Sequence, residues 1–95
     1  MLLKKKIRIQ NPQGLHARPA SIFVKIANKY ESGVTVRKGK EQVNGKSIMG
    51  LMMLAANQGT LITIEIDGKD AQAVMDELES FLSRTDEPRE AEGLT

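Results

Sequence analysis

A chain of 95 residues is long enough for one small domain. With 40% hydrophobic and 27% charged residues it has the composition of a soluble globular domain, and the absence of cysteine excludes disulfides and thiolate metal sites. With a single histidine as well, neither a metal nor a cofactor is expected. A net charge of +2 and only three aromatic residues argue against nucleic-acid binding. The first residues contain no apolar run typical of a signal peptide or membrane span, so a cytoplasmic protein without membrane insertion is predicted.

The first third of the chain predicts a strand, a turn and a helix. Residues 4–10 alternate, with Ile7 and Ile9 on one face, as in a half-buried strand. Proline and glycine in 11–14 indicate a turn. From 17 to about 28, apolar residues recur at helical spacing, namely Ala20, Phe23, Val24 and Ala27.

The middle of the chain predicts two short strands and a short helix. Residues 34–37 alternate, a glycine turn follows, and a brief strand is expected at 42–44. Ser47 is the expected N-cap of the helix. The apolar positions that follow it at helical spacing are Ile48, Leu51, Met52 and Ala55.

The last third predicts a strand, a helix and a tail. Residues 60–67 alternate, with three isoleucines facing inward, and Asp70 is a candidate cap for the next helix. That helix has the strongest amphipathic pattern in the chain, formed by Ala71, Val74, Met75, Leu78, Phe81 and Leu82. Residues 85–95 are polar and acidic, and a flexible C-terminal tail is expected beyond a domain of residues 1–84.

The order of elements is βαββαβα, and each strand has one apolar and one polar face. Such strands form an antiparallel sheet that helices cover on one side only. The sequence therefore predicts a two-layer α/β (α+β) open-faced sandwich with four strands.

The single histidine lies at the predicted start of the first helix. Unpaired backbone N–H groups and the positive end of the helix dipole favour an anion there. Arg18, two residues after His16, carries a guanidinium that can hold phosphate oxygens, and Pro19 is tolerated in a first turn. Imidazole is a competent nucleophile near pH 7, so His16 is a candidate phosphoryl acceptor. The alternatives are an exposed histidine without chemistry and a solvated arginine.

Two segments carry a resemblance to a known family: Gly-Leu-His-Ala-Arg-Pro-Ala at 14–20 and Asn-Gly-Lys-Ser-Ile-Met-Gly-Leu-Met at 44–52. From Lys4 to Leu82 the chain resembles HPr, the histidine-containing phosphocarrier family of the bacterial phosphoenolpyruvate-dependent phosphotransferase system. The resemblance implies strand order 1-4-2-3. It also implies that His16 takes a phosphoryl group from enzyme I at Nδ1 and passes it to enzyme IIA-type acceptors, with assistance from Arg18.

The second segment implies regulation and docking. By resemblance, Ser47 is a phosphorylation site for HPr kinase/phosphorylase, a transcriptional regulator is a further partner, and Ile48, Met49 and Met52 dock partners. A simple N-cap role remains the alternative for Ser47, since phosphoserine and serine both suit a helix N-terminus. Met49, Met52 and Met53 could be core, but so short a helix cannot bury them all, and exposed methionines suit a surface that meets several partners, which is the favoured interpretation.

Several functions stay open. The leading one is a monomeric phosphocarrier in sugar uptake, acting as a carrier rather than a stand-alone enzyme. Alternatives are the HPr paralogue of the nitrogen-related phosphotransfer chain and a non-carrier regulatory adaptor, although adaptors of this family lack the active histidine. Topology alone also allows a small-molecule-binding regulatory domain. Ile22 and Ile26 are expected on the outer side of the first helix, since its inner face does not require them, and they predict either a wider docking surface around His16 or a contact between copies.

Overall fold

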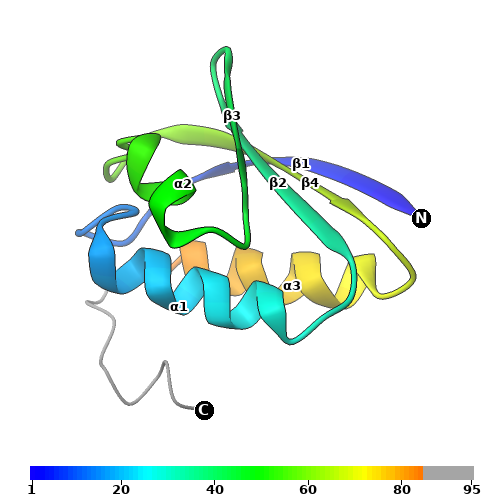
Figure 1. Ribbon diagram of the computed structural model, residues 1–95. Coiled ribbons are helices and arrows are strands. Elements are labelled where there is room, and N and C mark those ends of the chain that lie inside the picture. Colours follow the sequence, from blue (N-terminus) through cyan, green and yellow to red (C-terminus); the bar gives the residue numbers. More distant parts are fainter. Residues whose placement is uncertain (85–95) are drawn as a thin grey trace.

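The computed structural model describes residues 1–84 as a two-layer sandwich (Figure 1). The predicted flexible tail at 85–95 lies outside the described residues. Seven elements follow one another in the predicted order βαββαβα. They are β1 (Leu2–Arg8), α1 (Ala17–Asn28), β2 (Gly33–Lys38), β3 (Glu41–Asn44), α2 (Ile48–Met53), β4 (Leu61–Asp67) and α3 (Ala71–Leu82).

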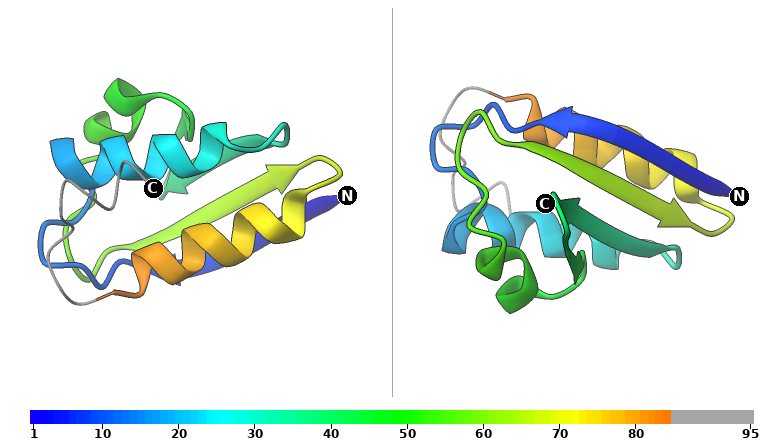
Figure 2. Two further views of the ribbon diagram at one scale, coloured as in Figure 1. Left: turned by 90° about the horizontal axis from the view of Figure 1, so that it is seen from below. Right: turned by 90° about the horizontal axis from the view of Figure 1, so that it is seen from above.

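The four strands form one antiparallel sheet in the order β1-β4-β2-β3, as expected. Its central strand β4 pairs with β1 from Leu2↔Asp67 to Arg8↔Leu61 and with β2 from Gly33↔Asp67 to Arg37↔Thr63. Helices α1 and α3 lie on one face, and the view from above shows the other face bare (Figure 2). The predicted fold class is therefore confirmed.

The core lies between the sheet and these two helices. The alternating isoleucines of β4, Ile62, Ile64 and Ile66, are at most 1% exposed, because their face of the strand is fully covered. The apolar stripes expected for α1 and α3 are buried against them. Each fully buried side chain of this size stabilises the fold by about 1.5–3 kcal/mol, so the core dominates stability.

Two assignments of apolar residues were wrong. Ile22 was expected on the outer side of α1, but it is buried in the core, and Ile26 is half-buried against it. The reason is that α1 contacts α2 and α3 as well as lying under the sheet, so its buried face is wider than one stripe. Ala55 was expected on the helical apolar face, yet α2 ends at Met53 and Ala55 is exposed with φ +50°.

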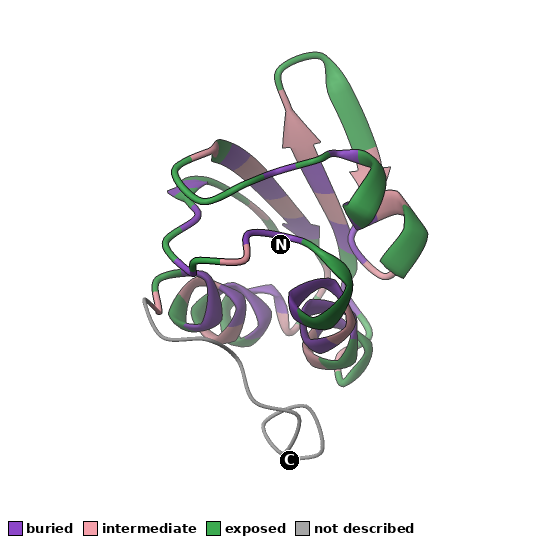
Figure 3. Cartoon of the chain, turned by 90° about the vertical axis from the view of Figure 1, so that its left-hand side faces the viewer, coloured by how far each residue is buried: buried purple, intermediate pink, exposed green. Residues whose placement is uncertain are grey.

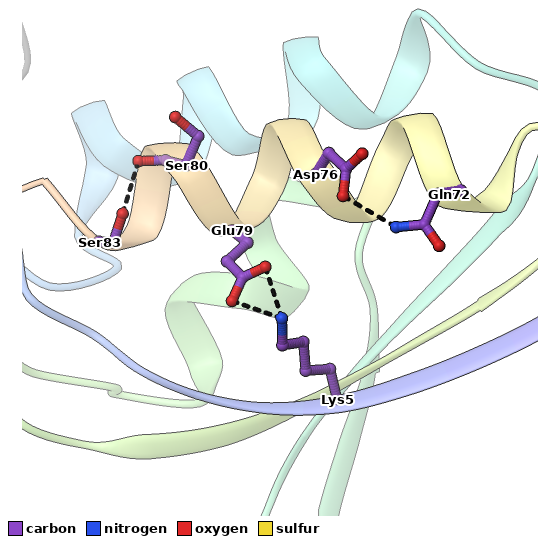
Figure 4. Close-up of polar contacts among 6 residues, drawn as sticks. All are labelled: Lys5, Gln72, Asp76, Glu79, Ser80 and Ser83. Carbon is purple, nitrogen blue, oxygen red and sulfur yellow. Dashed lines mark hydrogen bonds and ion pairs between the residues drawn. The ribbon is translucent and has the colours of Figure 1, made fainter.

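Exposed polar contacts join the layers and the turns of α3 (Figure 4). Lys5 of β1 reaches Glu79 of α3 at 2.7 Å, and Gln72 donates to Asp76 one helical turn away. At the C-terminal end of α3 the Ser83 hydroxyl donates to the Ser80 carbonyl at 3.1 Å. Exposed ion pairs of this kind contribute about 0–1 kcal/mol each to stability, so they add little to what the core provides.

Asp70 does not cap α3 with its side chain, contrary to expectation. Its carboxylate instead accepts hydrogen bonds from the hydroxyl and backbone N–H of Ser32 and from the backbone N–H of Glu31. It therefore ties the start of α3 to the loop that follows α1. The Ser32 hydroxyl above all, with these backbone donors, holds the pKa of the Asp70 carboxyl below its usual range.

This tie predicts an acid-dependent loss of stability. A carboxyl whose pKa is lower in the folded state stabilises the fold above its unfolded pKa, and the stabilisation is lost as pH falls through the folded value. We expect Asp70→Asn to have a lower Tm than the parent at pH 7, with the difference starting to shrink only as the pH falls below about 4, the usual pKa of an aspartate, and vanishing below the lowered pKa of folded Asp70. Thermal unfolding followed by circular dichroism from pH 2 to 7 measures this. A Tm difference that is constant over the whole range would contradict the role given to Asp70.

Candidate functional site

The loop between β1 and α1 is anchored where it leaves the strand. Ile9 continues the strand pairing, with its N–H donating to Thr60 at 2.9 Å and its carbonyl accepting from Gly59 at 2.8 Å. Gln10 N–H donates to the carbonyl of Leu82, the last residue of α3, at 2.9 Å. These bonds place the loop at the end of the sandwich where α3 terminates.

The two residues before the histidine fix the loop against the segment after α2. Gly14 has φ +61°, a left-handed conformation that favours glycine, and it lies against the backbone of Ala56 and Asn57. Leu15 is buried, and its N–H donates to the carbonyl of Ala56 at 2.8 Å. The backbone therefore arrives at His16 from a rigid support.

His16 is the N-cap residue of α1, with extended backbone dihedrals of φ −79° and ψ −172°. Its carbonyl accepts the first helical bond from Ala20 N at 2.8 Å, whereas its side chain makes no capping hydrogen bond. The residue is exposed. The imidazole therefore lies at the start of a helix, exposed to solvent, and makes no capping hydrogen bond that the fold depends on.

Arg18 lies in the first turn of α1 and is exposed. No acidic residue occurs in that turn, and no hydrogen bond or ion pair joins the Arg18 side chain to another residue within 1–84. Pro19 beside it is buried, which fixes the turn. A guanidinium without a partner, next to free helical N–H groups, can bind an anion near the imidazole.

Ser47 caps α2 as predicted. Its Oγ accepts a hydrogen bond from Gly50 N at 3.0 Å, and its backbone is extended, with φ −115° and ψ 117°. The carbonyl of Ser47 accepts from Leu51 N at 3.0 Å. The side chain is half-buried, so it performs a structural role irrespective of any modification.

The side chains of α2 form an exposed apolar patch, which we call the methionine surface: Ile48, Met49, Met52 and Met53. Met49 and Met53 are 74% and 73% exposed, and only Leu51 of the helix is buried. Helix α2 contacts α1. Figure 3 shows the exposed start of α1 and the exposed residues of α2 at the same end of the molecule. The methionine surface therefore flanks the start of α1, as an extended interaction surface would.

Sequence reasoning missed two residues that support this site. Asn11, fully buried in the loop before Gly14, donates from Nδ2 to the Gly14 carbonyl at 2.9 Å. An asparagine three residues before a glycine is a turn signature that could have indicated it. Lys38, at the end of β2, donates to the carbonyl of Leu54 at 3.0 Å and so stabilises the C-terminal end of α2. No sequence pattern pairs that lysine with a helix 16 residues away.

Two further properties concern ligands and membranes. Among residues 1–84, no three histidine, aspartate or glutamate side chains come together as a metal site would require. No helix in this part of the chain is long and apolar enough to cross a membrane.

Comparison with known proteins defines the class to which this fold and site belong. Residues 3–84 match the family model described as the PTS HPr component phosphorylation site. The chain is 48% identical over 82 residues to the phosphocarrier protein HPr of Neisseria meningitidis serogroup A, an alignment covering 86% of this chain and 92% of the relative. The crystal structure of HPr from Bacillus anthracis superimposes with a TM-score of 0.83 at 37% identity, covering 85% and 96% of the two chains.

A second similar structure is Crh of Bacillus subtilis, with a TM-score of 0.69 and 40% identity over 84% of this chain and 92% of that one. Its crystal structure was described as a dimer with a swapped domain, so the monomeric state expected for the present chain stays a prediction. The fold is that of the HPr-like open-faced sandwiches. The chain belongs to the HPr family of phosphocarrier proteins of the phosphotransferase system.

Proposed function

We propose that the protein accepts a phosphoryl group from phospho-enzyme I on His16 and passes it to an enzyme IIA-type acceptor during sugar uptake in the cytoplasm. The observation that carries the proposal is the exposed imidazole at the N-cap of α1, which forms no capping hydrogen bond. A histidine placed only to cap the helix would be expected to bond the free N–H groups of the first turn.

The nucleophile and the anion-binding groups for the transfer are both present at this site. The lone pair of Nδ1 of neutral His16 attacks phosphorus, and the N–P bond forms as the bond between phosphorus and the donor atom of phospho-enzyme I breaks, its electron pair remaining on the donor. The ring keeps its proton on Nε2 during the attack, so an imidazolium forms beside the negative phosphoryl oxygens, and the ring becomes neutral when that proton is released to solvent. Arg18 and the N–H groups of the first turn stabilise the phosphoryl oxygens. The reverse bond changes deliver the group to the acceptor.

A carrier must release what it binds, and the energies of this site suit that requirement. A helix N-terminus contributes about 0.3–1 kcal/mol to a nearby anion, and a charged hydrogen bond from Arg18 about 1.5–3 kcal/mol. Since about 1.4 kcal/mol is tenfold in an equilibrium, these terms retain the phosphoryl group without trapping it. Exposure of both side chains allows donor and acceptor to approach in turn.

Intact-mass spectrometry tests the proposal. The protein is incubated with enzyme I, magnesium and phosphoenolpyruvate, then measured before and after brief acid treatment. One added phosphate that acid removes supports a phosphohistidine carrier. No added mass, with an enzyme I shown to phosphorylate a known HPr, would contradict it and favour a regulatory adaptor.

We also propose that Ser47 is a regulatory phosphorylation site for a kinase of the HPr kinase/phosphorylase type. What supports this is its place at the N-cap of α2, beside the methionine surface. A phosphate there adds about −1.5 to −2 charges next to apolar side chains on which partners would dock. Docking would then weaken while the core of the domain is left intact.

The charge effect can be imitated by substitution. Ser47→Asp is expected to keep the helix cap and to raise the KM of enzyme I for this protein roughly tenfold, equivalent to about 1.4 kcal/mol of lost docking energy. Initial rates of phosphoryl transfer at varied concentrations of the variant measure it. Ser47→Ala is the matched control: it loses about 1 kcal/mol of stability with the cap but adds no charge, so its KM should stay near the parent value. Equal KM values for the Asp and Ala variants would refute the docking role.

A further inference from the structure

The loop before His16 contains a buried polar side chain with one unmet hydrogen bond. Asn11 is 1% exposed, and among the described residues its Oδ1 is the only buried side-chain oxygen or nitrogen without a partner. Leaving an acceptor unpaired in the interior is unfavourable, so an apolar residue would serve better if the position only filled space. The benefit must come from the other half of the amide, the Nδ2 group that donates to the Gly14 carbonyl at 2.9 Å.

That hydrogen bond completes a clamp on a single peptide unit. The C=O of the Gly14–Leu15 peptide accepts from Asn11, and the N–H of the same peptide donates to the Ala56 carbonyl at 2.8 Å. The Asn11 carbonyl also accepts from Gly14 N at 3.1 Å, which closes the turn through the main chain. Rotation of this peptide plane, two residues from the histidine, is thereby prevented on both sides.

The clamp bears directly on His16. Leu15 is buried and cannot absorb a change, so a rotation of the Gly14–Leu15 plane would be passed on to the backbone of His16 and to its imidazole. The side chain of His16 forms no capping bond that could hold it otherwise. Transfer reactions are sensitive to such errors, since a displacement of about 1 Å can cost on the order of 100-fold in rate.

We propose that Asn11 is a positioning residue for phosphoryl transfer, holding the peptide plane that aims His16. The inference rests on the proposed function of His16. Asn11 touches neither donor nor phosphoryl group; it acts through Gly14 and Leu15.

Two variants remove the amide donor in different ways. Asn11→Ala removes the side chain, and Asn11→Asp keeps its shape but presents an oxygen that cannot donate when ionised, so failure of one to fold leaves the other. The matched control is Ser32→Ala, which removes a different buried hydrogen-bonding side chain beside Asp70, at the opposite end of the sandwich. All are assayed below their Tm for phosphoryl acceptance from enzyme I, and their His16 ring resonances are recorded by NMR without phosphorylation.

We expect both Asn11 variants to lower kcat by about tenfold or more with little change in KM, and to shift the His16 ring resonances, whereas Ser32→Ala changes neither. Acceptance rates equal to that of Ser32→Ala, or ring resonances identical to the parent, would overturn the inference. If the parent itself accepts no phosphate, the proposed function fails, while the resonances still decide whether Asn11 orients the ring.

Discussion

Replacement of His16 by alanine is expected to abolish phosphoryl acceptance and to leave the fold unchanged. The side chain is exposed and makes no capping hydrogen bond, so its removal should change the free energy of unfolding by no more than about 0.5 kcal/mol. It is also the only histidine in the chain, and no cysteine is present as a substitute nucleophile. Intact mass and thermal unfolding of the same preparation report the two effects separately.

The matched control is Arg18→Ala, which keeps the nucleophile and removes the unpaired guanidinium. It should still gain an acid-labile phosphate, but more slowly, because a charged hydrogen bond of about 1.5–3 kcal/mol to the phosphoryl oxygens is missing. Acid-labile phosphate on His16→Ala at the parental rate would show that the acceptor lies elsewhere.

Replacement of Gly14 by alanine is expected to destabilise the protein by about 2–4 kcal/mol. A φ of +61° costs a non-glycine residue roughly 1–2 kcal/mol. In addition, the new Cβ would lie 2.5 Å from the Ala56 carbonyl oxygen and 2.7 Å from Asn57 Cα, both backbone atoms that cannot move independently. For a domain of this size the loss corresponds to a fall in Tm on the order of 10–20 °C, measurable by thermal unfolding.

Gly39 provides the comparison for this substitution. It has nearly the same φ, +59°, but nothing lies within 4 Å of a Cβ built on it. Gly39→Ala should therefore cost only the backbone contribution of roughly 1–2 kcal/mol. Equal losses for the two variants would mean that the contact with the segment at 56–57 is unimportant and that the loop before His16 is not supported there.

Regular alternation made most of the fold predictable. The three isoleucines of β4 specified the buried face of the central strand, and the stripe of α3 specified the helix that covers it. One-dimensional periodicity reports which side of an element is apolar. It does not report how many neighbours that side has, which is why Ile22 was misplaced on a helix that contacts both α2 and α3.

The exposed part of the site was predictable for a different reason. His16, Arg18 and Ser47 are functional candidates by residue type at a helix start, and such positions follow from local sequence. Most of the contacts that support these residues do not follow from local sequence. The bond from Leu15 to Ala56 depends on the loop meeting a segment about 40 residues away, and the Asp70 carboxylate bonds the loop at 31–32 rather than its own helix. The bond from Asn11 to Gly14 is local, but its role becomes visible only once the loop is seen to be packed against that segment.

The arrangement of α1 and α3 separates two kinds of residue along the long direction of the sandwich. The exposed histidine and the methionine surface lie at the end where α1 begins, whereas Asp70 and its partners, and the contacts of Glu77 with Lys29 and Tyr30, lie where α1 ends (Figure 1). Selection for heat or acid tolerance can therefore act on one end without altering what the other end presents to its partners. In a hotter or more acidic habitat, the contacts of Asp70 and Glu77 could change during evolution while His16 and the methionine surface stayed compatible with unchanged partner proteins.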